Sequence, residues 1–160
     1  HIKINISDER KLLLDTGGGI FKGTEPFNEN PFIVINPDTI WNNGYLDELN
    51  KLEKIFFKES KSSLLLVKKD NSFDTSFKGD FNLSDNLVSR DLENEFIFTG
   101  AQILNRKIFQ SVNKEIFSMN AIWDILIQER NLIGIESHQK FYHVNTKHTY
   151  DQILKLKSID

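Results

Sequence analysis

The sequence contains no cysteine, which excludes disulfide bonds and thiolate metal sites. No apolar run approaches the roughly 20 residues that a membrane-spanning helix needs, and no signal peptide opens the chain. Basic residues form no block and the net charge is −3, so nothing favours a nucleic-acid partner. The chain also shows no internal repeat, low-complexity tract or second domain. These absences favour a cytoplasmic protein of one domain, with neither nucleic acid nor a membrane as its partner.

What the chain does contain is typical of a globular protein. Of its 160 residues, 39% are hydrophobic and 27% are charged, which is enough apolar material for a core. The first residue is His1 rather than Met, and Ile2, Ile4 and Ile6 alternate with polar residues as in a strand. We therefore expect a strand over His1–Ile6, and we interpret the chain as a fragment or a processed product.

The spacing of apolar residues predicts an α/β order of elements. Phe32–Ile35, Tyr45–Ser60 and Ser62–Val67 are expected to form a right-handed strand–helix–strand unit. The other expected elements are a hairpin over Phe81–Val88, a strand over Glu95–Leu104, helices over Asn105–Val112 and Ser118–Asn131 that begin at their capping residues, paired strands over Leu132–Ser137 and Lys140–Val144, and a terminal helix over Thr149–Ile159.

Phe32–Ile35 is the stretch around which we expect the chain to be organised. Its four apolar residues lack polar alternation and predict a strand buried on both faces of a parallel sheet. Pro37 ends the strand because proline cannot donate to a sheet ladder. Asp38 then lies just past the carboxyl end of the strand, where open α/β sheets bind ligands. A carboxylate there is a candidate Mg²⁺ ligand, although position alone fits a turn-capping aspartate somewhat better.

Three consecutive glycines, Gly17–Gly19, follow Asp15 and Thr16. Glycine permits positive φ and a close approach of the backbone to a ligand. Thr16 is a candidate cap for a short helix through Gly19–Gly23, whose free N–H groups would face that ligand. Without other context, a flexible turn is the simpler interpretation. Gly100 raises the same choice inside its strand, because a glycine there marks either a bulge or a close ligand contact.

Taken together, the chain resembles the sugar-1-phosphate nucleotidyltransferases. The resemblance rests on the Asp-Thr-Gly-Gly-Gly-Ile run at Asp15–Ile20, the Asn-x-Asp-x-x-Trp segment at Asn36–Trp41, and the later segments Phe98–Gly100 and Phe141–Thr146. It is greatest to the branch of N-acetylmuramate-1-phosphate uridylyltransferases and mannose-1-phosphate guanylyltransferase-like enzymes. It implies an α/β, Rossmann-like and GT-A-like fold of three layers, with helices on both faces of the sheet. Residues 1–160 would be the C-terminal portion of a single nucleotidyltransferase domain whose N-terminal part is missing.

The resemblance also implies the chemistry. A sugar 1-phosphate would attack the α-phosphorus of a nucleoside triphosphate, releasing pyrophosphate and forming a nucleoside diphosphate sugar. Asp38 would be the catalytic residue and would hold Mg²⁺ against the α-phosphate. Glu136 would face the sugar together with His138, although placement on the surface fits the pair equally well. The residues that the resemblance assigns to ligands are Asp15, Thr16, Gly17 and Gly18 for the nucleotide, and Gly100 and Glu136 for the sugar.

His143 departs from the pattern of the family. Many relatives carry a second metal-binding carboxylate in a late Trp-x-Asp-Val-Gly-Thr motif, and the aligned stretch here is Phe141–Thr146. His143 stands where that carboxylate would be. Imidazole is a poor ligand for Mg²⁺, which prefers hard oxygen donors. His143 is therefore either a second metal contact beside Asp38 or a hydrogen-bond partner of a phosphate.

The glycine-rich Gly-x-Gly-x-Arg loop, with which the family grips the triphosphate, is absent from these residues. We therefore expect the isolated chain to bind a nucleoside triphosphate weakly, and to associate with a complementary N-terminal piece or with another copy of itself. A second interpretation is a non-catalytic regulatory module that binds sugar or nucleotide. A metal-dependent glycosyltransferase is a weaker one, because no Asp-x-Asp follows a strand.

Overall fold

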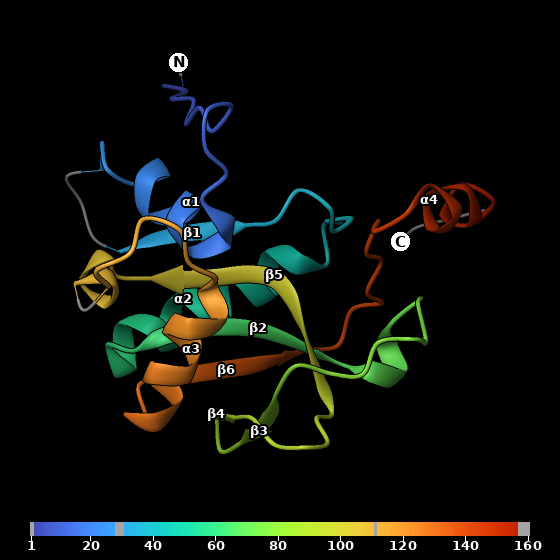
Figure 1. The fold of residues 1–160 in the computed structure, drawn as a ribbon. Helices are drawn as coiled ribbons and strands as arrows, with labels where there is room; N and C mark the ends of the chain where they lie inside the picture. Colours follow the sequence, from blue (N-terminus) through green and yellow to red (C-terminus); the bar gives the residue numbers. More distant parts are fainter. Residues whose placement is uncertain (1, 28–30, 111, 157–160) are drawn as a thin grey trace.

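The structure is a computed structural model and describes residues 2–27, 31–110 and 112–156. Within these ranges six strands form one mixed sheet in the order β1-β5-β2-β6-β4-β3 (Figure 1). The strands are β1 (Phe32–Ile35), β2 (Ser62–Lys68), β3 (Asn82–Ser84), β4 (Leu87–Ser89), β5 (Phe96–Leu104) and β6 (Leu132–Ser137). The helices are α1 (Asp15–Gly23), α2 (Tyr45–Glu59), α3 (Met119–Gln128) and α4 (Lys147–Ile153), with 3-10 turns η1 (Lys69–Asn71) and η2 (Arg106–Phe109). None of these helices is long and apolar enough to cross a membrane.

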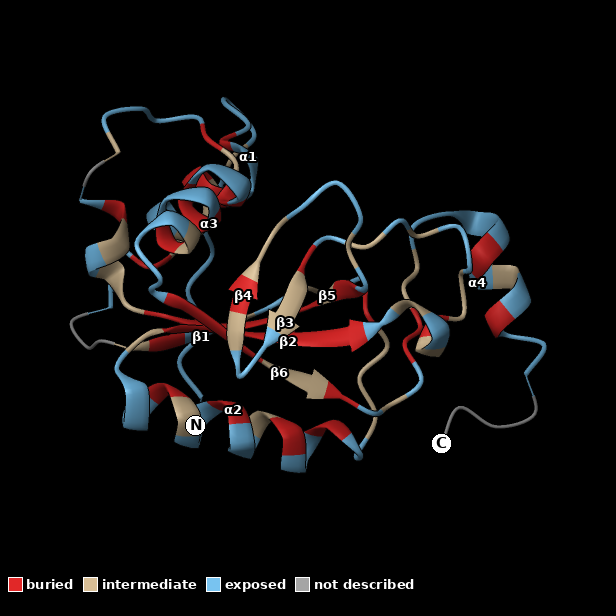
Figure 2. Cartoon of the chain, turned by 90° about the horizontal axis from the view of Figure 1, so that it is seen from below, coloured by how far each residue is buried: buried red, intermediate tan, exposed pale blue. Residues whose placement is uncertain are grey.

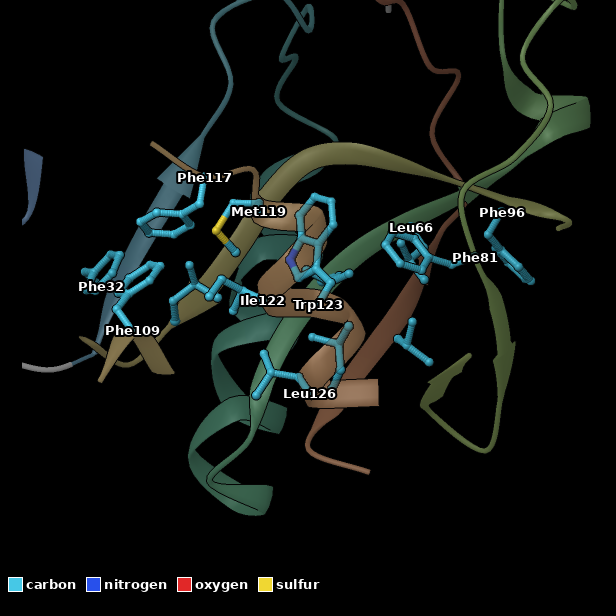
Figure 3. Close-up of a cluster of buried hydrophobic side chains, with 14 residues drawn as sticks. Phe32, Leu66, Phe81, Phe96, Phe109, Phe117, Met119, Ile122, Trp123 and Leu126 are labelled. Atoms are coloured by element: carbon cyan, nitrogen blue, oxygen red, sulfur yellow. The ribbon is translucent and has the colours of Figure 1, made fainter. Parts of the chain in front are cut away.

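Helices cover both faces of the sheet, as expected for the α/β class. Figure 2 shows α2 on one side of the strands and α1 and α3 on the other. The core beneath α2 consists of Tyr45, Leu52, Phe56, Leu65, Ala101 and Ile103. The larger core on the opposite face is gathered around Trp123 of α3 (Figure 3). The Trp123 ring lies edge-on to Phe81 and Phe98, and its Nε1 donates to Gln102 Oε1 at 3.1 Å, so the buried amide has a partner.

Most of the locally encoded elements are confirmed with small shifts of their ends. These are α2, β2, β5, β6, α3 and the hairpin of β3 and β4. The hairpin turns at Asp85 and Asn86, which both have positive φ, as a tight turn between twisted strands requires. Ser118 caps α3 by accepting from the Asn120 amide, and Asn105 caps η2 by accepting from the Lys107 amide. η2 is shorter than the helix expected over Asn105–Val112, of which residue 111 lies outside the described residues.

The interpretation of Phe32–Ile35 as a central parallel strand is wrong. β1 lies at one end of the strand order and pairs antiparallel with β5. Ile33 and Ile35 are 48% and 44% exposed, so the strand is buried on one face only. β1 and β2 run in the same direction but are separated by β5, which means that they are not hydrogen-bonded neighbours. A run of four apolar residues does not distinguish these situations, because pairing is decided by distant parts of the chain.

The expectations for the two ends of the chain are also corrected. Residues 2–6 form no strand, and Ile2, Ile4 and Ile6 are all more than 80% exposed, while His1 lies outside the described residues. The stretch Lys140–Val144 does not pair with β6. It makes single bridges instead, from Phe141 to Ser72 and from His143 to Thr39. The terminal helix is Lys147–Ile153 rather than Thr149–Ile159, and residues 157–160 are outside the described ranges.

The three glycines lie inside α1 rather than before a helix. The amides of Gly17 and Gly18 donate to the Phe117 carbonyl at 2.9 and 3.0 Å, so these two N–H groups are not free. Thr16 does not cap a helix through Gly19–Gly23, because α1 already begins at Asp15. Its Oγ1 accepts from the Met119 amide at 2.9 Å instead. The glycines therefore let α1 pack directly on the backbone that leads into α3.

This packing predicts opposite effects for two glycine-to-alanine changes in α1. A Cβ at Gly18 would overlap the Glu115 backbone carbonyl, whereas one at Gly23 would meet only Ser7 Cβ at 3.8 Å. We expect Gly18→Ala to lower the free energy of unfolding by about 1–3 kcal/mol, through overpacking against backbone. Gly23→Ala is expected to raise it by up to about 1 kcal/mol, because alanine favours helix. Urea denaturation checks both, and equal stabilities of the two variants would contradict the packing.

Candidate functional site

The carboxyl ends of β1, β2 and β6 meet at one edge of the sheet. β1 and β2 both run antiparallel to β5, and β6 runs parallel to β2. In Figures 1 and 2 the arrows of β2 and β6 point towards the side where α4 lies. The segments that follow these strands, residues 36–44, 69–80 and 138–146, therefore converge on this edge. It is the position at which open α/β sheets bind ligands, and we call it the carboxyl edge.

The loop that carries Asp38 is closed by its own neighbours. Trp41 Nε1 donates to the Asn36 carbonyl at 2.9 Å, which accounts for the spacing of the Asn-x-Asp-x-x-Trp segment. The buried Thr39 hydroxyl donates to the Thr99 carbonyl at 2.7 Å. The Val144 amide donates to the Asp38 carbonyl at 2.7 Å. With its backbone held at several points, Asp38 presents its side chain in a restricted set of orientations.

Asp38 and His143 lie together at this edge. His143 Nδ1 is 3.8 Å from Asp38 Oδ1, at the outer limit of an ion pair, and the two side chains are 22% and 46% exposed respectively. The imidazole stacks on Phe141, with ring centres 6.0 Å apart and planes inclined by 13°, and meets Phe77 edge-on. A half-exposed carboxylate therefore stands beside an imidazole whose orientation is fixed by aromatic packing.

Asp74 is a third ionisable group of this edge, and sequence reasoning missed it. Its Oδ1 accepts from the Ser76 hydroxyl and amide at 2.6 and 2.9 Å, and its Oδ2 lies 3.5 Å from Asn145 Nδ2. These hydrogen bonds, those from Ser76 foremost, lower the pKa of Asp74, and the nearby His143 adds to the effect. The signal was available, because the argument that singled out Asp38 after β1 applies equally to residues that follow β2.

Glu136 lies on β6 next to basic partners. Its Oε1 is 3.5 Å from Lys68 Nζ on the neighbouring strand β2 and 3.6 Å from His138 Nδ1. The side chain is partly exposed, so a ligand is able to reach it. Contact of Glu136 with a sugar stays a prediction.

Buried Glu48 of α2 anchors the segment after β6. One of its carboxylate oxygens accepts from the His138 amide at 3.0 Å, and the Gln139 side-chain amide lies 3.5 Å away. Its other oxygen is buried without a hydrogen-bond partner among the described residues. Burial next to this charge raises the pKa of Tyr45 well above its usual range, burial being the larger cause. Tyr45 therefore stays neutral at neutral and moderately alkaline pH.

The fold itself requires a glycine at position 100. Its φ is +96°, and an added Cβ would lie 2.7 Å from Asn36 Cβ. The residue therefore lets β5 approach β1 closely where β1 ends, and its carbonyl accepts from the Asn36 amide at 2.9 Å. Gly100 thus lies opposite Asn36, two residues before Asp38 in the chain. A backbone contact between Gly100 and a sugar stays a prediction.

Asp15–Gly18 are held apart from the other candidates. Their polar contacts are with the segment that leads into α3, on one face of the sheet. Among the described residues no hydrogen bond or ion pair joins α1 to Asp38, Glu136 or His143. Nucleotide binding by Asp15, Thr16, Gly17 and Gly18 stays a prediction.

Comparison with known proteins identifies the fold. No protein-family model and no curated protein matches the sequence. Among solved structures, HddC from Yersinia pseudotuberculosis, determined in complex with GMP-PN, is 24% identical with a TM-score of 0.63, over 87% of this chain and 60% of HddC. The inositol-1-phosphate CTP transferase from T. maritima is 14% identical with a TM-score of 0.65, over 85% of this chain and 58% of that one. UDP-glucose pyrophosphorylase from Acinetobacter baumannii is 12% identical with a TM-score of 0.69, over 89% and 55%.

At these identities the similarity shows a shared fold. The α/β fold expected from the sequence, with helices on both faces of the sheet, is thereby confirmed in the form found in these nucleotidyltransferase structures. The chain spans about 60% of the length of the solved structures that it resembles.

The buried hydroxyl beside Asp38 gives a prediction for the rigidity of the site. Thr39→Val keeps the shape of the side chain but removes the hydrogen bond to the Thr99 carbonyl. We expect the free energy of unfolding to fall by about 1–3 kcal/mol, because a buried carbonyl loses its donor. The matched change Thr75→Val, at an exposed position of the next segment, is expected to leave stability within about 0.5 kcal/mol of the native value. Chemical denaturation of both variants checks this, and equal midpoints would contradict the assigned hydrogen bond.

Proposed function

We propose that the chain is part of a nucleotidyltransferase that forms a nucleoside diphosphate sugar and pyrophosphate from a nucleoside triphosphate and a sugar 1-phosphate. The observation that carries the proposal is the half-exposed Asp38, held beside His143 at the carboxyl edge. Its support is a fold shared with proteins named as a CTP transferase and a UDP-glucose pyrophosphorylase. The Asp-Thr-Gly-Gly-Gly-Ile and Asn-x-Asp-x-x-Trp segments favour the branch of N-acetylmuramate-1-phosphate and mannose-1-phosphate enzymes.

In this reaction the protein mainly has to position the two substrates, and it forms no covalent bond with either of them. An oxygen of the sugar 1-phosphate forms a bond to the α-phosphorus, while the bond from that phosphorus to the bridging oxygen of the β-phosphate breaks and pyrophosphate takes the electron pair. Catalysis then rests on alignment of the two phosphates and on charges that stabilise the transition state. The hydrogen bonds at Thr39 and Val144 fix the backbone from which the Asp38 carboxylate projects.

The donor set fits Mg²⁺ that arrives with a substrate better than a resident ion. Among the described residues no three His, Cys, Asp or Glu side chains are grouped to hold a metal. Mg²⁺ in phosphate chemistry is usually held by one or two carboxylates together with substrate phosphates, and Asp38 supplies one of these. Bound there, the ion would neutralise charge on the phosphate oxygens. His143 remains a candidate second contact, but its imidazole is better suited to donate a hydrogen bond to a phosphate oxygen.

The remaining assignments complete the proposal. Glu136 and the backbone at Gly100 would contact the sugar, and Asp15–Gly18 would contribute to the nucleotide pocket. The buried Glu48 would act as a positioning residue, because it holds the His138 amide next to Glu136. These residues do not specify which nucleobase or which sugar is used.

A binding module without catalysis is the second candidate function. It is favoured by His143, which stands where the resemblance implies a second carboxylate. Such a module would bind the sugar phosphate or the nucleotide and release no pyrophosphate.

The two functions are separated by one experiment. The chain, extended by an N-terminal segment that carries the Gly-x-Gly-x-Arg loop, is incubated with each nucleoside triphosphate, a panel of sugar 1-phosphates and Mg²⁺, and pyrophosphate release is measured beside calorimetric binding. Release that requires both substrates supports the transferase. Saturable binding without release favours the module, and binding of neither class of compound would contradict both.

The role of Asp38 gives a sharper prediction. Asp38→Asn keeps the size of the side chain and removes its charge, and we expect turnover, or the Mg²⁺-dependent part of ligand binding, to fall ~100-fold or more. Stability should hardly change, because the carboxylate is half exposed. Asp47→Asn, on the exposed face of α2, is the matched control and should leave both quantities unchanged. Retention of most activity and binding by Asp38→Asn would refute the assignment.

A further inference from the structure

A pocket lies at the amino end of β2, at the opposite end of the sheet from the carboxyl edge. Its volume is about 650 Å³, within the range of roughly 300–1,000 Å³ that is typical of small-molecule sites. The end of α2, the start of β2, η2 and one side of α3 enclose it. In Figure 2 the start of β2 lies at the end of the sheet away from α4. The length of β2, seven residues or about 23 Å, therefore separates this pocket from the carboxyl edge.

The walls of the pocket are apolar and come from both layers of the protein. Phe56 of α2 belongs to the core beneath that helix, and Ile122 and Leu126 of α3 belong to the core around Trp123. Ile125 of α3 adds a side chain that is 39% exposed. The pocket thus opens where the two cores end at the same side of the sheet. Such walls favour the apolar part of a ligand, because contact with them removes it from water.

Ser62 lines the same pocket with a polar group that the fold does not use. The residue is 5% exposed, and its hydroxyl makes no hydrogen bond with any described residue. Side chains alternate along a strand, so Ser62 lies on the same face of β2 as Leu64 and Leu66, which pack in the core around Trp123. The hydroxyl therefore faces the α3 side of the pocket. Buried polar groups normally have a partner, and a ligand in the pocket would supply one.

Two ammonium groups stand among the lining residues, those of Lys61 after α2 and Lys107 of η2. Neither makes an ion pair or hydrogen bond with a described residue. Glu129 also lines the pocket, and its carboxylate accepts from the Asn131 side chain at 3.3 Å. The carboxyl end of α2 offsets part of the charge of Lys61, whereas Lys107 belongs to no α-helix. With the Ser62 hydroxyl, the two lysines form a set of donors suited to anionic oxygens.

We propose that this pocket binds a small amphipathic anion. The apolar part of the ligand lies between Phe56 and Leu126, and its carboxylate or phosphate group accepts hydrogen bonds from Ser62, Lys61 and Lys107. The proposal concerns a second binding site, distant from Asp38, and does not depend on nucleotidyl transfer.

Four probes with the same eight-carbon chain separate the head group from the apolar part. They are octanoate, octyl phosphate, octanol and octylammonium, each used below the concentration at which it aggregates. Calorimetry on the 160-residue chain measures the affinities, since every lining residue lies within it. We expect octanoate and octyl phosphate to bind at one site, about tenfold or more tightly than octanol, and octylammonium not to bind. The tighter of the two anions identifies the head group as a carboxylate or a phosphate.

Variants place the binding in this pocket. Ile125→Ser should weaken octanoate about fivefold or more, whereas Leu46→Ser, which changes an exposed leucine in a separate groove, is the matched control and should not. Lys61→Gln should weaken octanoate to a similar degree and leave octanol unchanged. Lys58→Gln controls for it, because Lys58 also lies near the end of α2 but outside the pocket. Ser62→Ala should weaken octanoate without lowering the melting temperature, since its hydroxyl has no partner to lose.

The outcomes that would overturn the proposal are equally specific. One is the absence of saturable binding by both anions, and another is an equal affinity for octanoate and octanol. Anion binding that Ile125→Ser and Lys61→Gln leave unchanged would place the ligand elsewhere and refute the assigned pocket. Binding of octylammonium in preference to octanoate would overturn the proposal in favour of a cation held by the carboxyl ends of the helices.

Discussion

The close crossing of β1 and β5 at Asn36 and Gly100 is the constraint on which the carboxyl edge depends. Gly100 has a positive φ and no side chain, so β1 comes near enough for the Asn36 amide to reach its carbonyl. From that point the chain turns, and Thr39 and Trp41 fasten the turn to β5 and to Asn36. The direction of the Asp38 side chain follows from a backbone contact two residues earlier. Any side chain at Gly100 would move the acidic residue as well as the strand.

The same edge is held from two further sides. Segment 138–146 reaches Asp38 through the Val144 amide, and it is itself anchored to α2 by the Glu48 carboxylate under His138. A buried carboxylate costs free energy unless it is hydrogen-bonded, so the His138 amide lowers the cost of burying Glu48 only while that segment stays in place. Helix α2, strand β5 and the segment after β6 therefore constrain one another around a small group of ionisable residues.

Sequence patterns predicted the parts of this arrangement that are encoded locally. The helix Tyr45–Glu59, the strands β2 and β6, and the caps at Ser118 and Asn105 depend on a few neighbouring residues, and they were found. The meeting of Asp38 and His143 followed from the family resemblance rather than from spacing. The position of β1 at the sheet edge was missed, because partners are chosen over long separations. A helix was expected only through Gly19–Gly23, with a flexible turn as the alternative, because glycine disfavours helix. The hydrogen bonds to the Phe117 carbonyl and the tight packing override that preference, so that α1 begins at Asp15.

Under the proposed function, the charges at the carboxyl edge favour a phosphate ligand that brings its own cation. Asp38 stands beside His143, Glu136 beside Lys68 and His138, and Asp74 within the influence of His143. Each acid thus already has a basic neighbour, and the two imidazoles are charged only when protonated. A triphosphate approaching this edge would meet carboxylates whose partners are engaged, and the repulsion would oppose binding. A divalent ion carried on the phosphates reverses the sign of that interaction for Asp38, the half-exposed carboxylate that can turn towards it. The histidine in place of a second carboxylate then has a physical consequence: it reduces the negative charge that such a complex must overcome.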